Sequence, residues 1–321
     1  MLHRFLSALL LLLLAGCSTS KPTVASWYHT PPHNTSAILY GVGEGVDLAS
    51  AKAMALSQIA YAISTTLESR YDKRDQSIRF NANEQTLQEV EHRITTKSPT
   101  LHFNTVYIDK EQWVEGRLYV LVHIERERLY AEEQQRLEER LDAYRRRFEH
   151  AASRSSLEQF VQLQRFHDDA NALNAHIALL HAIDAHRDTS QYRRFIQTYE
   201  DRYEAHKSAL RLQIVADARS QGFQEIIYQN LVKHGITIDK RGADGTIVVT
   251  SKYNKEKLLG YYIEQCYLHV NCRDGDAATV ASRDYIFVGK SRIDFSQSHH
   301  DCVQQFALKV TNEGIFKSLG L

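Results

Sequence analysis

ILYGVGEGVDLASAKAMALSQIA, residues 38–60, is the stretch that decides the fold of the N-terminal part of the chain. Residues 38–42 predict a strand, and residues 43–45, Gly-Glu-Gly, are typical of a turn. A phosphate-binding loop would need a different glycine spacing and a following Lys-Ser or Lys-Thr pair. We therefore interpret Gly41, Gly43 and Gly45 as a tight turn that needs positive φ angles.

A helix and two further strands are expected after this turn. Asp47 is suited to cap the helix N-terminus, and apolar side chains then recur along one face, at Ala55, Leu56, Ile59, Ala60, Ile63 and Leu67. Residues 101–108 and 118–124 are expected to pair as strands, the second alternating Leu118, Val120, Val122 and Ile124 on one face. Residues 84–94 suit another helix. Residues 38–125 are therefore predicted to form a small α+β domain.

The central region, residues 126–212, has the composition of helices. It contains no proline and is dense in Glu, Arg, Gln and Ala. Breaks at residues 153–156 and 188–190 divide it into three segments with apolar stripes at helical spacing. Because narrow stripes need partners and the connections are short, we predict a helical hairpin or three-helix bundle.

The last region, residues 213–321, returns to mixed character. Residues 223–234 predict a helix, four strands are expected at 236–238, 246–250, 259–270 and 285–293, and a final helix carries Val303, Phe306, Ala307 and Val310. This order predicts a C-terminal α+β domain with helices on one face of an antiparallel sheet. The fold class of the whole chain is α+β.

The first residues have the pattern of a bacterial secretion signal. His3 and Arg4 precede an apolar run over residues 5–15, which is too short to cross a bilayer because a spanning helix needs about 20 apolar residues. The run ends in Leu14, Ala15, Gly16 and Cys17, which resembles the lipobox cut by the lipoprotein signal peptidase. We expect residues 1–16 to be a signal peptide and Cys17 to carry lipid; the alternative is an ordinary signal peptide with an incidental cysteine.

Residues 17–37 are rich in Ser, Thr and Pro, which is typical of a tether. The lipobox implies a diacylglycerol and an N-acyl lipid on Cys17, and several chains anchor stably because each buried methylene contributes about 0.8 kcal/mol. No other cofactor is expected. An Asp after the cysteine would favour the inner membrane, so Ser18 favours the outer membrane, with the protein facing the periplasm.

The charge of the chain argues against nucleic acid as a partner. The sequence has 39 Lys and Arg and 39 Asp and Glu, and removal of residues 1–16 takes away Arg4 and no acidic residue, which leaves a net charge near −1. Such a chain lacks the basic field on which nucleic-acid recognition depends.

The N-terminal motifs resemble those of a known family. Trp27 and Tyr28, the run from Leu39 to Gly45, and the helix residues Ala49, Ala51, Lys52, Ala55, Ile59 and Ala60 are similar to the twenty-kilodalton lipoprotein (Lpp-twenty-like) family. The resemblance covers residues 27–130, where Tyr119 to Val122 fits a later strand. It implies an envelope lipoprotein, related to domains of flagellar outer-membrane-associated proteins, and it implies no catalytic residues.

Histidines do not form a recognisable metal motif. His176, His181 and His186 are five residues apart on a predicted helix, so successive rings are rotated by about 140°. His299 and His300 lie near Asp294 and Asp301, but adjacent residues on a helix diverge. Neither set gives three or four convergent ligands, so no metal site is expected.

Three cysteines, Cys266, Cys272 and Cys302, remain besides Cys17. Cys266 and Cys272 lie on one strand about 20 Å apart, which is too far for a disulfide. Because the final helix is expected to start near the beginning of this strand, we predict a Cys266–Cys302 disulfide. A catalytic Cys-His pair is the alternative, but no motif supports it. No Gly-x-Ser-x-Gly elbow is present either.

These observations favour a non-enzymatic envelope lipoprotein that contacts envelope or flagellar proteins and reaches the membrane through its lipid. The alternative is a periplasmic ligand-binding protein or a hydrolase that acts on a cell-envelope substrate in a cleft. A third interpretation is a spacer, in which residues 126–212 set only the reach of the protein.

Overall fold

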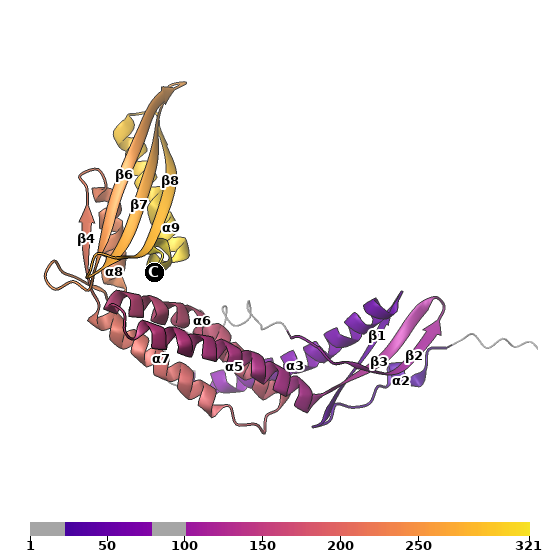
Figure 1. Cartoon of the computed structure of the whole chain (residues 1–321). Coiled ribbons are helices and arrows are strands. Elements are labelled where there is room, and N and C mark those ends of the chain that lie inside the picture. Colours follow the sequence, from indigo (N-terminus) through magenta and orange to yellow (C-terminus); the bar gives the residue numbers. More distant parts are fainter. Residues whose placement is uncertain (1–22, 79–100) are drawn as a thin grey trace, which may run out of the picture. The chain divides into compact units, whose positions relative to one another are not determined.

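The computed structural model describes residues 23–78 and 101–321, and the chain divides into two compact units (Figure 1). Unit 1 comprises residues 1–136 and 175–189, and unit 2 comprises residues 137–174 and 190–321. The lipobox with Cys17 and the helix expected at residues 84–94 lie outside the described residues. The domain limits expected from the sequence stay a prediction.

Unit 1 is built on a three-stranded antiparallel sheet with the strand order β1-β3-β2. After the short helix α2 (Ser26–His29) come β1 (Ile38–Gly45), α3 (Leu48–Ile78), β2 (Tyr107–Val114) and β3 (Arg117–Glu125). Asp47 caps α3 as predicted, because its Oδ1 accepts a hydrogen bond from the backbone N–H of Ser50 at 2.8 Å. The helix buries one stripe against β1 and β3, namely Ala51, Ala55, Ile59 and Ile63.

The predicted glycine turn is wrong. Strand β1 continues to Gly45, and none of Gly41, Gly43 and Gly45 has a positive φ. These glycines instead allow α3 to lie close to β1, since a Cβ on Gly41 would lie 2.3 Å from the carbonyl oxygen of Ala55. A Cβ on Gly43 would lie 2.1 Å from the carbonyl oxygen of Ala51. The absent side chains therefore let the backbone of α3 lie directly on the strand.

The strand predicted at residues 101–108 is also misplaced. Strand β2 is Tyr107–Val114, and it joins β3 through a two-residue turn in which Glu115 and Gly116 have φ angles of 47° and 79°. Most of β2 is exposed at the edge of the sheet, so it lacks the apolar alternation that marks half-buried strands. Strand β3 has the predicted alternation, with Leu118, Val120, Val122 and Ile124 all buried.

Three helices follow at the predicted breaks: α5 (Arg126–Ala151), α6 (Ser156–Ile183) and α7 (Ser190–Ala209). Residues 137–151 of α5, 156–174 of α6 and all of α7 belong to unit 2. There they meet in an aromatic cluster, where Phe148 stacks on Tyr199 at 4.1 Å between ring centroids and Phe166 packs edge-on against Tyr144 at 5.0 Å. None of the described helices is long and apolar enough to cross a membrane.

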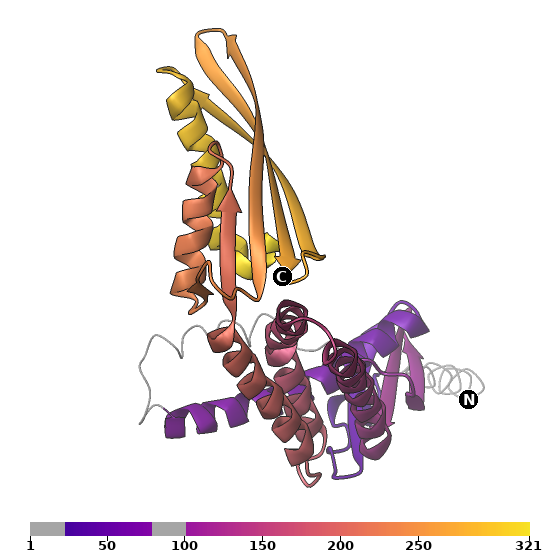
Figure 2. The same ribbon diagram turned by 60° about the vertical axis from the view of Figure 1, so that its left-hand side comes forward.

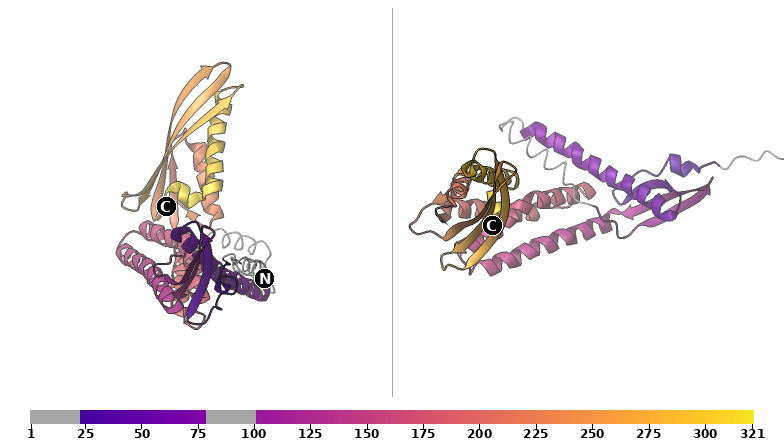
Figure 3. Two further views of the ribbon diagram at one scale, coloured as in Figure 1. Left: turned by 90° about the vertical axis from the view of Figure 1, so that its right-hand side faces the viewer. Right: turned by 90° about the horizontal axis from the view of Figure 1, so that it is seen from above.

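The rest of unit 2 is a five-stranded sheet with the order β5-β4-β6-β7-β8. Its elements are β4 (Arg211–Ala216), α8 (Gln221–Lys233), β5 (Thr237–Ile238), β6 (Gly245–Leu258), β7 (Tyr261–Asp274), β8 (Thr279–Ser291), α9 (Phe295–Glu313) and α10 (Ile315–Leu319). Helices α8 and α9 cover one face, as predicted (Figure 2), and α9 runs along that face in Figure 3.

The sheet differs from the prediction in two ways. It is mixed, not antiparallel, because β4 pairs in parallel with both β5 and β6. Strand β4 directly follows the helical region and was not recognised as a strand. The strand expected at 246–250 continues to Leu258, and the turn of a long hairpin is formed by Leu259 and Gly260, both with positive φ. The buried face of β7 is as predicted, with Cys266, Leu268, Val270 and Cys272 in the core.

Candidate functional site

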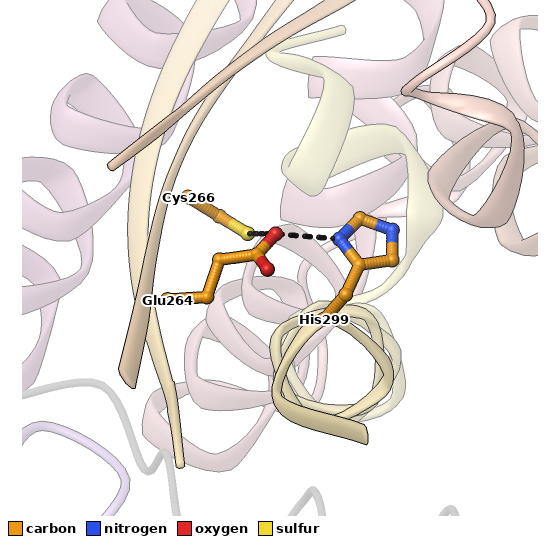
Figure 4. Close-up of side chains that lie close together, drawn as sticks. All are labelled: Glu264, Cys266 and His299. Carbon is orange, nitrogen blue, oxygen red and sulfur yellow. Dashed lines mark hydrogen bonds and ion pairs between the residues drawn. The ribbon is translucent and has the colours of Figure 1, made fainter. Parts of the chain in front are cut away.

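Strand β7 and helix α9 bring four reactive side chains together, which we call the Glu-Cys-His-Cys cluster: Glu264, Cys266, His299 and Cys302 (Figure 4 shows the first three). Glu264 and Cys266 are two residues apart on β7, so they point to the same face of the sheet. His299 and Cys302 are three residues apart on α9 and share one face of that helix. Asp294 fixes the start of α9 by accepting a hydrogen bond from the N–H of Gln297 at 2.8 Å.

The distances within the cluster are short. Nδ1 of His299 lies 3.0 Å from Oε1 of Glu264, and Sγ of Cys266 lies 4.0 Å from the same oxygen. One ligand atom from each of these three side chains lies within 4.8 Å of those of the other two. Sγ of Cys302 lies 3.4 Å from the backbone carbonyl oxygen of Glu264. A carboxylate, an imidazole and the sulfur of Cys266 therefore converge on one point, and the sulfur of Cys302 lies against the backbone beside them.

The two thiols of the cluster are fully buried and interact with each other. The hydrogen bond between Cys266 and Cys302 raises the pKa of Cys266, and burial adds to this. The same hydrogen bond lowers the pKa of Cys302. Both cysteines are free thiols in the structure, so the predicted Cys266–Cys302 disulfide stays a prediction. Sγ of Cys272 instead lies 3.7 Å from the carbonyl oxygen of Leu319, and burial raises its pKa to about 12.

Helix α9 approaches the sheet this closely because β8 has a glycine at the contact. A Cβ on Gly289 would lie 1.8 Å from the carbonyl oxygen of Ser298 and 3.0 Å from Sγ of Cys302. Any larger residue would therefore push α9 away from β7. Gly289 therefore sets the distance between Glu264 and Cys266 on β7 and the side chains that α9 contributes to the cluster.

Glu264 is the most unusual member of the cluster, because a carboxylate is 1% exposed in the interior of an apolar core. Its Oε2 atom accepts no hydrogen bond, and its counter-charge is the ammonium group of Lys255, whose Nζ lies 3.5 Å away. Burying a carboxylate costs free energy unless its oxygens are paired. One oxygen of Glu264 is therefore available to a further positively charged partner.

A cavity of about 590 Å³ opens onto the cluster. It is lined by Ala218, Arg219, Tyr253, Lys255, Glu264 and His299. The hydroxyl of Tyr253 accepts from Ser251 at 2.6 Å and donates to the carbonyl oxygen of Arg219 at 2.7 Å, and burial raises the pKa of this tyrosine to about 12. Solvent therefore reaches His299, whose side chain is 32% exposed, while Glu264 and the two thiols are buried.

A second cavity, of about 550 Å³, lies at the facing ends of α5 and α6 in unit 2. Four arginines and a histidine line it together with a single acidic residue, Glu158; the basic residues are Arg146, Arg147, His150, Arg154 and Arg165. An excess of guanidinium groups in one concave surface is suited to an anionic ligand. We call this the arginine pocket.

The free end of the β6–β7 hairpin exposes apolar side chains. Leu259 is 90% exposed, Leu258 is 49% exposed, and Ile293, which follows β8 at the same end of the sheet, is 74% exposed. Basic side chains beside them rest on tyrosine rings: Lys257 lies 4.6 Å from the ring centre of Tyr262, and Arg292 lies 4.9 Å from that of Tyr261. We call this surface the hairpin tip.

The sequence identified only part of these sites. His299 was considered with His300, Asp294 and Asp301, but the structure does not bring those four together. His300 is exposed, Asp294 caps α9, and Asp301 accepts from the backbone N–H of Lys290. Glu264 was missed. The spacings Glu264-x-Cys266 and His299-x-x-Cys302 would have indicated that each pair shares a face. Among the other histidines, His176 faces Glu133 at 3.1 Å.

No protein-family model and no curated protein sequence matches the chain. Solved structures similar to it include the secreted protein HP1454 of Helicobacter pylori, with 16% identity, a TM-score of 0.48, and coverage of 88% of this chain and 98% of that one. A minor lipoprotein of Acinetobacter baumannii shares 11% identity over 33% of this chain and 91% of its own, with a TM-score of 0.28. The lipoprotein GNA1162 of Neisseria meningitidis shares 10% identity over 32% of this chain and 99% of its own, with a TM-score of 0.25. Secreted proteins and lipoproteins are thus among the structures similar to this chain; at these scores the similarity assigns no function, and the Lpp-twenty-like resemblance stays a prediction.

Proposed function

We propose that the chain is a lipid-anchored lipoprotein of the bacterial cell envelope, attached to the outer membrane through Cys17, that binds an envelope protein without catalysing a reaction. The lipobox sequence supports the anchor. The observation that carries the binding role is the hairpin tip, where three apolar side chains are exposed at one end of the sheet. Association with a flagellar protein is the narrower form of the same proposal.

The chemistry of the hairpin tip indicates the kind of partner. Leu258, Leu259 and Ile293 would gain about 25 cal/mol for each Å² of apolar surface that a partner covers. Arg292 donates a hydrogen bond to the hydroxyl of Tyr261 at 2.5 Å, so its guanidinium is held in place. A guanidinium held in one place pairs better with a carboxylate of a protein than with a fluid lipid surface. We therefore expect a protein with an apolar pocket bordered by acidic residues.

Site-specific photo-cross-linking in living cells tests this role. A photoreactive residue at Leu259 is expected to capture one envelope protein, whereas the same residue at Ala277, at the opposite end of the sheet, is not. The capture should be lost when Lys257→Glu and Arg292→Glu reverse the charge beside the apolar residues. Equal capture from both positions, capture that survives charge reversal, or attachment to lipid alone would contradict the proposal.

The arginine pocket favours the second candidate function, a periplasmic protein that binds an anionic ligand. Calorimetric titration with inorganic phosphate, the simplest probe, is expected to show saturable binding that Arg154→Ser and Arg165→Ser remove. Arg193→Ser, at an exposed arginine of α7 that is not among the lining residues of the pocket, is the control. If no saturable binding occurs, or if all three variants bind equally, the ligand-binding role fails.

A further inference from the structure

We infer that the Glu-Cys-His-Cys cluster binds one divalent metal ion of the zinc class. Its side chains offer a carboxylate, an imidazole and two thiols, all of which are ligands of tetrahedral zinc sites. Alkaline-earth ions prefer oxygen ligands only, whereas sulfur and imidazole nitrogen together favour zinc. The site is independent of the proposed binding role of the hairpin tip.

The geometry is close to what such an ion requires. Ligand atoms that lie about 2.0–2.3 Å from zinc at tetrahedral angles are roughly 3.3–3.8 Å from one another. In the cluster, the distances to Oε1 of Glu264 are 3.0 Å from His299 and 4.0 Å from Cys266. Adjustments of about 1 Å would bring the ligand atoms of Glu264, Cys266 and His299 to these distances. Cys302, whose Sγ lies 3.4 Å from the backbone carbonyl oxygen of Glu264, would supply the fourth ligand by rotation of its side chain. The backbone need not move, because β7 and α9 already hold the ligands on facing surfaces.

The unsatisfied carboxylate oxygen is suited to pair with a cation. Glu264 has its side chain 2% exposed and an Oε2 atom without a hydrogen bond. Lys255 neutralises it only from 3.5 Å, with a side chain that is 52% exposed. A metal ion would pair with the carboxylate directly, while Lys255 could stay beside it.

The charges of such a site would balance. Each thiol that binds the metal releases its proton to water, so two thiolates and one carboxylate contribute three negative charges around a neutral His299. The divalent ion and the ammonium group of Lys255 together supply three positive charges. The cavity in front of Glu264 and His299 gives the ion a route from solvent.

The predicted disulfide and the metal site exclude each other, because both use the sulfur atoms of Cys266 and Cys302. The metal site requires Cys266 and Cys302 as reduced thiols. Glu264 contacts both cysteines, and the ligand nitrogen of His299 lies within 4.8 Å of the sulfur of Cys266; a purely structural disulfide would need neither side chain.

The experiment uses the full chain, extracted in detergent without chelator. Mass spectrometry of the bound metal is expected to find about one zinc ion per chain, as for a single structural site. After removal of zinc, titration with Co²⁺ should produce the near-ultraviolet band of sulfur-to-cobalt charge transfer. Cys302→Ala should reduce that band by about half, because one of two thiolates is lost. His299→Asn should weaken Co²⁺ binding by at least about tenfold, through loss of a ligand.

Two matched variants control for unfolding and for nonspecific binding. Cys272→Ala removes another buried cysteine from the same face of β7, and His300→Asn removes the neighbouring exposed histidine. Both should retain the band and the affinity. The inference would be overturned if His299→Asn and His300→Asn bound Co²⁺ equally, if the chain retained no zinc after equilibration with Zn²⁺, or if peptide mapping of alkylated chain showed Cys266 joined to Cys302.

Discussion

At the scale of single residues, the absence of a side chain is as important as its presence. Because Gly41, Gly43 and Gly45 have no side chain, the backbone of α3 packs directly on β1. Gly289 in the same way lets α9 pack closely on β7 and β8. Each contact places a helix backbone where a Cβ would otherwise lie. These four glycines therefore determine helix position, whereas Gly116 and Gly260 serve turns with positive φ.

Gly43→Ala should destabilise unit 1 strongly. Its Cβ would meet the carbonyl oxygen of Ala51 at 2.1 Å, a backbone atom that can move only with the helix. We expect a loss of about 3 kcal/mol in the free energy of unfolding, at the upper end for overpacking. Urea unfolding can be followed for this unit alone, because both tryptophans of the chain, Trp27 and Trp113, belong to it.

Gly116→Ala is the matched control for this prediction. Nothing lies within 4 Å of a Cβ at this position, but its φ is 79°. Only backbone strain opposes the substitution, so about 1 kcal/mol is expected. If Gly43→Ala cost no more than Gly116→Ala, the close-approach explanation would be wrong.

At the scale of elements, close contacts between buried polar side chains link neighbouring helices. In unit 1, Glu133 of α5 is 2% exposed, and its Oε2 lies 3.1 Å from Nε2 of His176 of α6. Arg136 pairs with its other oxygen at 2.5 Å. Burial would raise the pKa of Glu133, but these partners outweigh it and the pKa is lowered. The carboxylate is therefore charged at neutral pH.

Glu133→Leu should destabilise unit 1 because it leaves His176 buried without its carboxylate. Removing one member of a buried pair costs about 3 kcal/mol, whereas replacing both by apolar residues restores most of the stability. Tryptophan fluorescence in urea should therefore show the double variant Glu133→Leu with His176→Leu to be more stable than Glu133→Leu alone. A double variant less stable than the single one would refute this pairing.

In unit 2, α6 and α7 are joined by a hydrogen-bonded pair of a histidine and a carboxylate. Nδ1 of His167 lies 2.8 Å from Oε2 of Glu200, and this hydrogen bond raises the pKa of His167 against the effect of burial. Asp168 and Glu204 act in the same direction. Because the folded pKa exceeds the unfolded value of about 6.5, the stabilisation is complete below that pH and is lost as pH rises through the folded pKa.

Unit 2 should therefore be more stable at pH 6 than at pH 8.5 on account of His167. The side chain is 40% exposed, so the difference should be below about 1 kcal/mol. Urea unfolding followed by tyrosine circular dichroism should show that His167→Gln reduces this difference, while His300→Gln at an exposed site does not. A variant that kept the full pH dependence would contradict the assignment.

The elements also show what the sequence could predict. Helices with long apolar stripes, and the alternating strands β3 and β7, were found because burial imposes their period on the sequence. The exposed edge strand β2 and the short parallel strand β4 were not, because little apolar patterning marks them. The sequence does not distinguish glycines that allow close packing of a helix from glycines that adopt a positive φ in a turn. The predicted Cys266–Cys302 pair already placed the final helix beside β7, but the cluster was missed because Glu264 was not considered with Cys266 on the same face of the strand, nor His299 with Cys302 on the same face of the helix.

At the scale of the whole molecule, the two units supply different chemistry. Unit 2 carries the hairpin tip, the arginine pocket and the Glu-Cys-His-Cys cluster. Unit 1 contains the segment nearest in sequence to the expected lipid anchor and carries the residues that resemble the Lpp-twenty-like family. We expect residues 17–37 to connect the anchor to this unit and the hairpin tip to bind the partner. The lipid would then confine a binding surface to the envelope.

The most direct test of this account is the fate of Cys17. Cells that express the chain with Cys17→Ser, with Cys272→Ser as control, are fractionated into soluble and membrane material, and the outer membrane is separated by density. The account predicts that the control sediments with the outer membrane, whereas Cys17→Ser does not and lacks the labelled fatty acid. A Cys17→Ser protein that still sediments with that membrane would contradict the account.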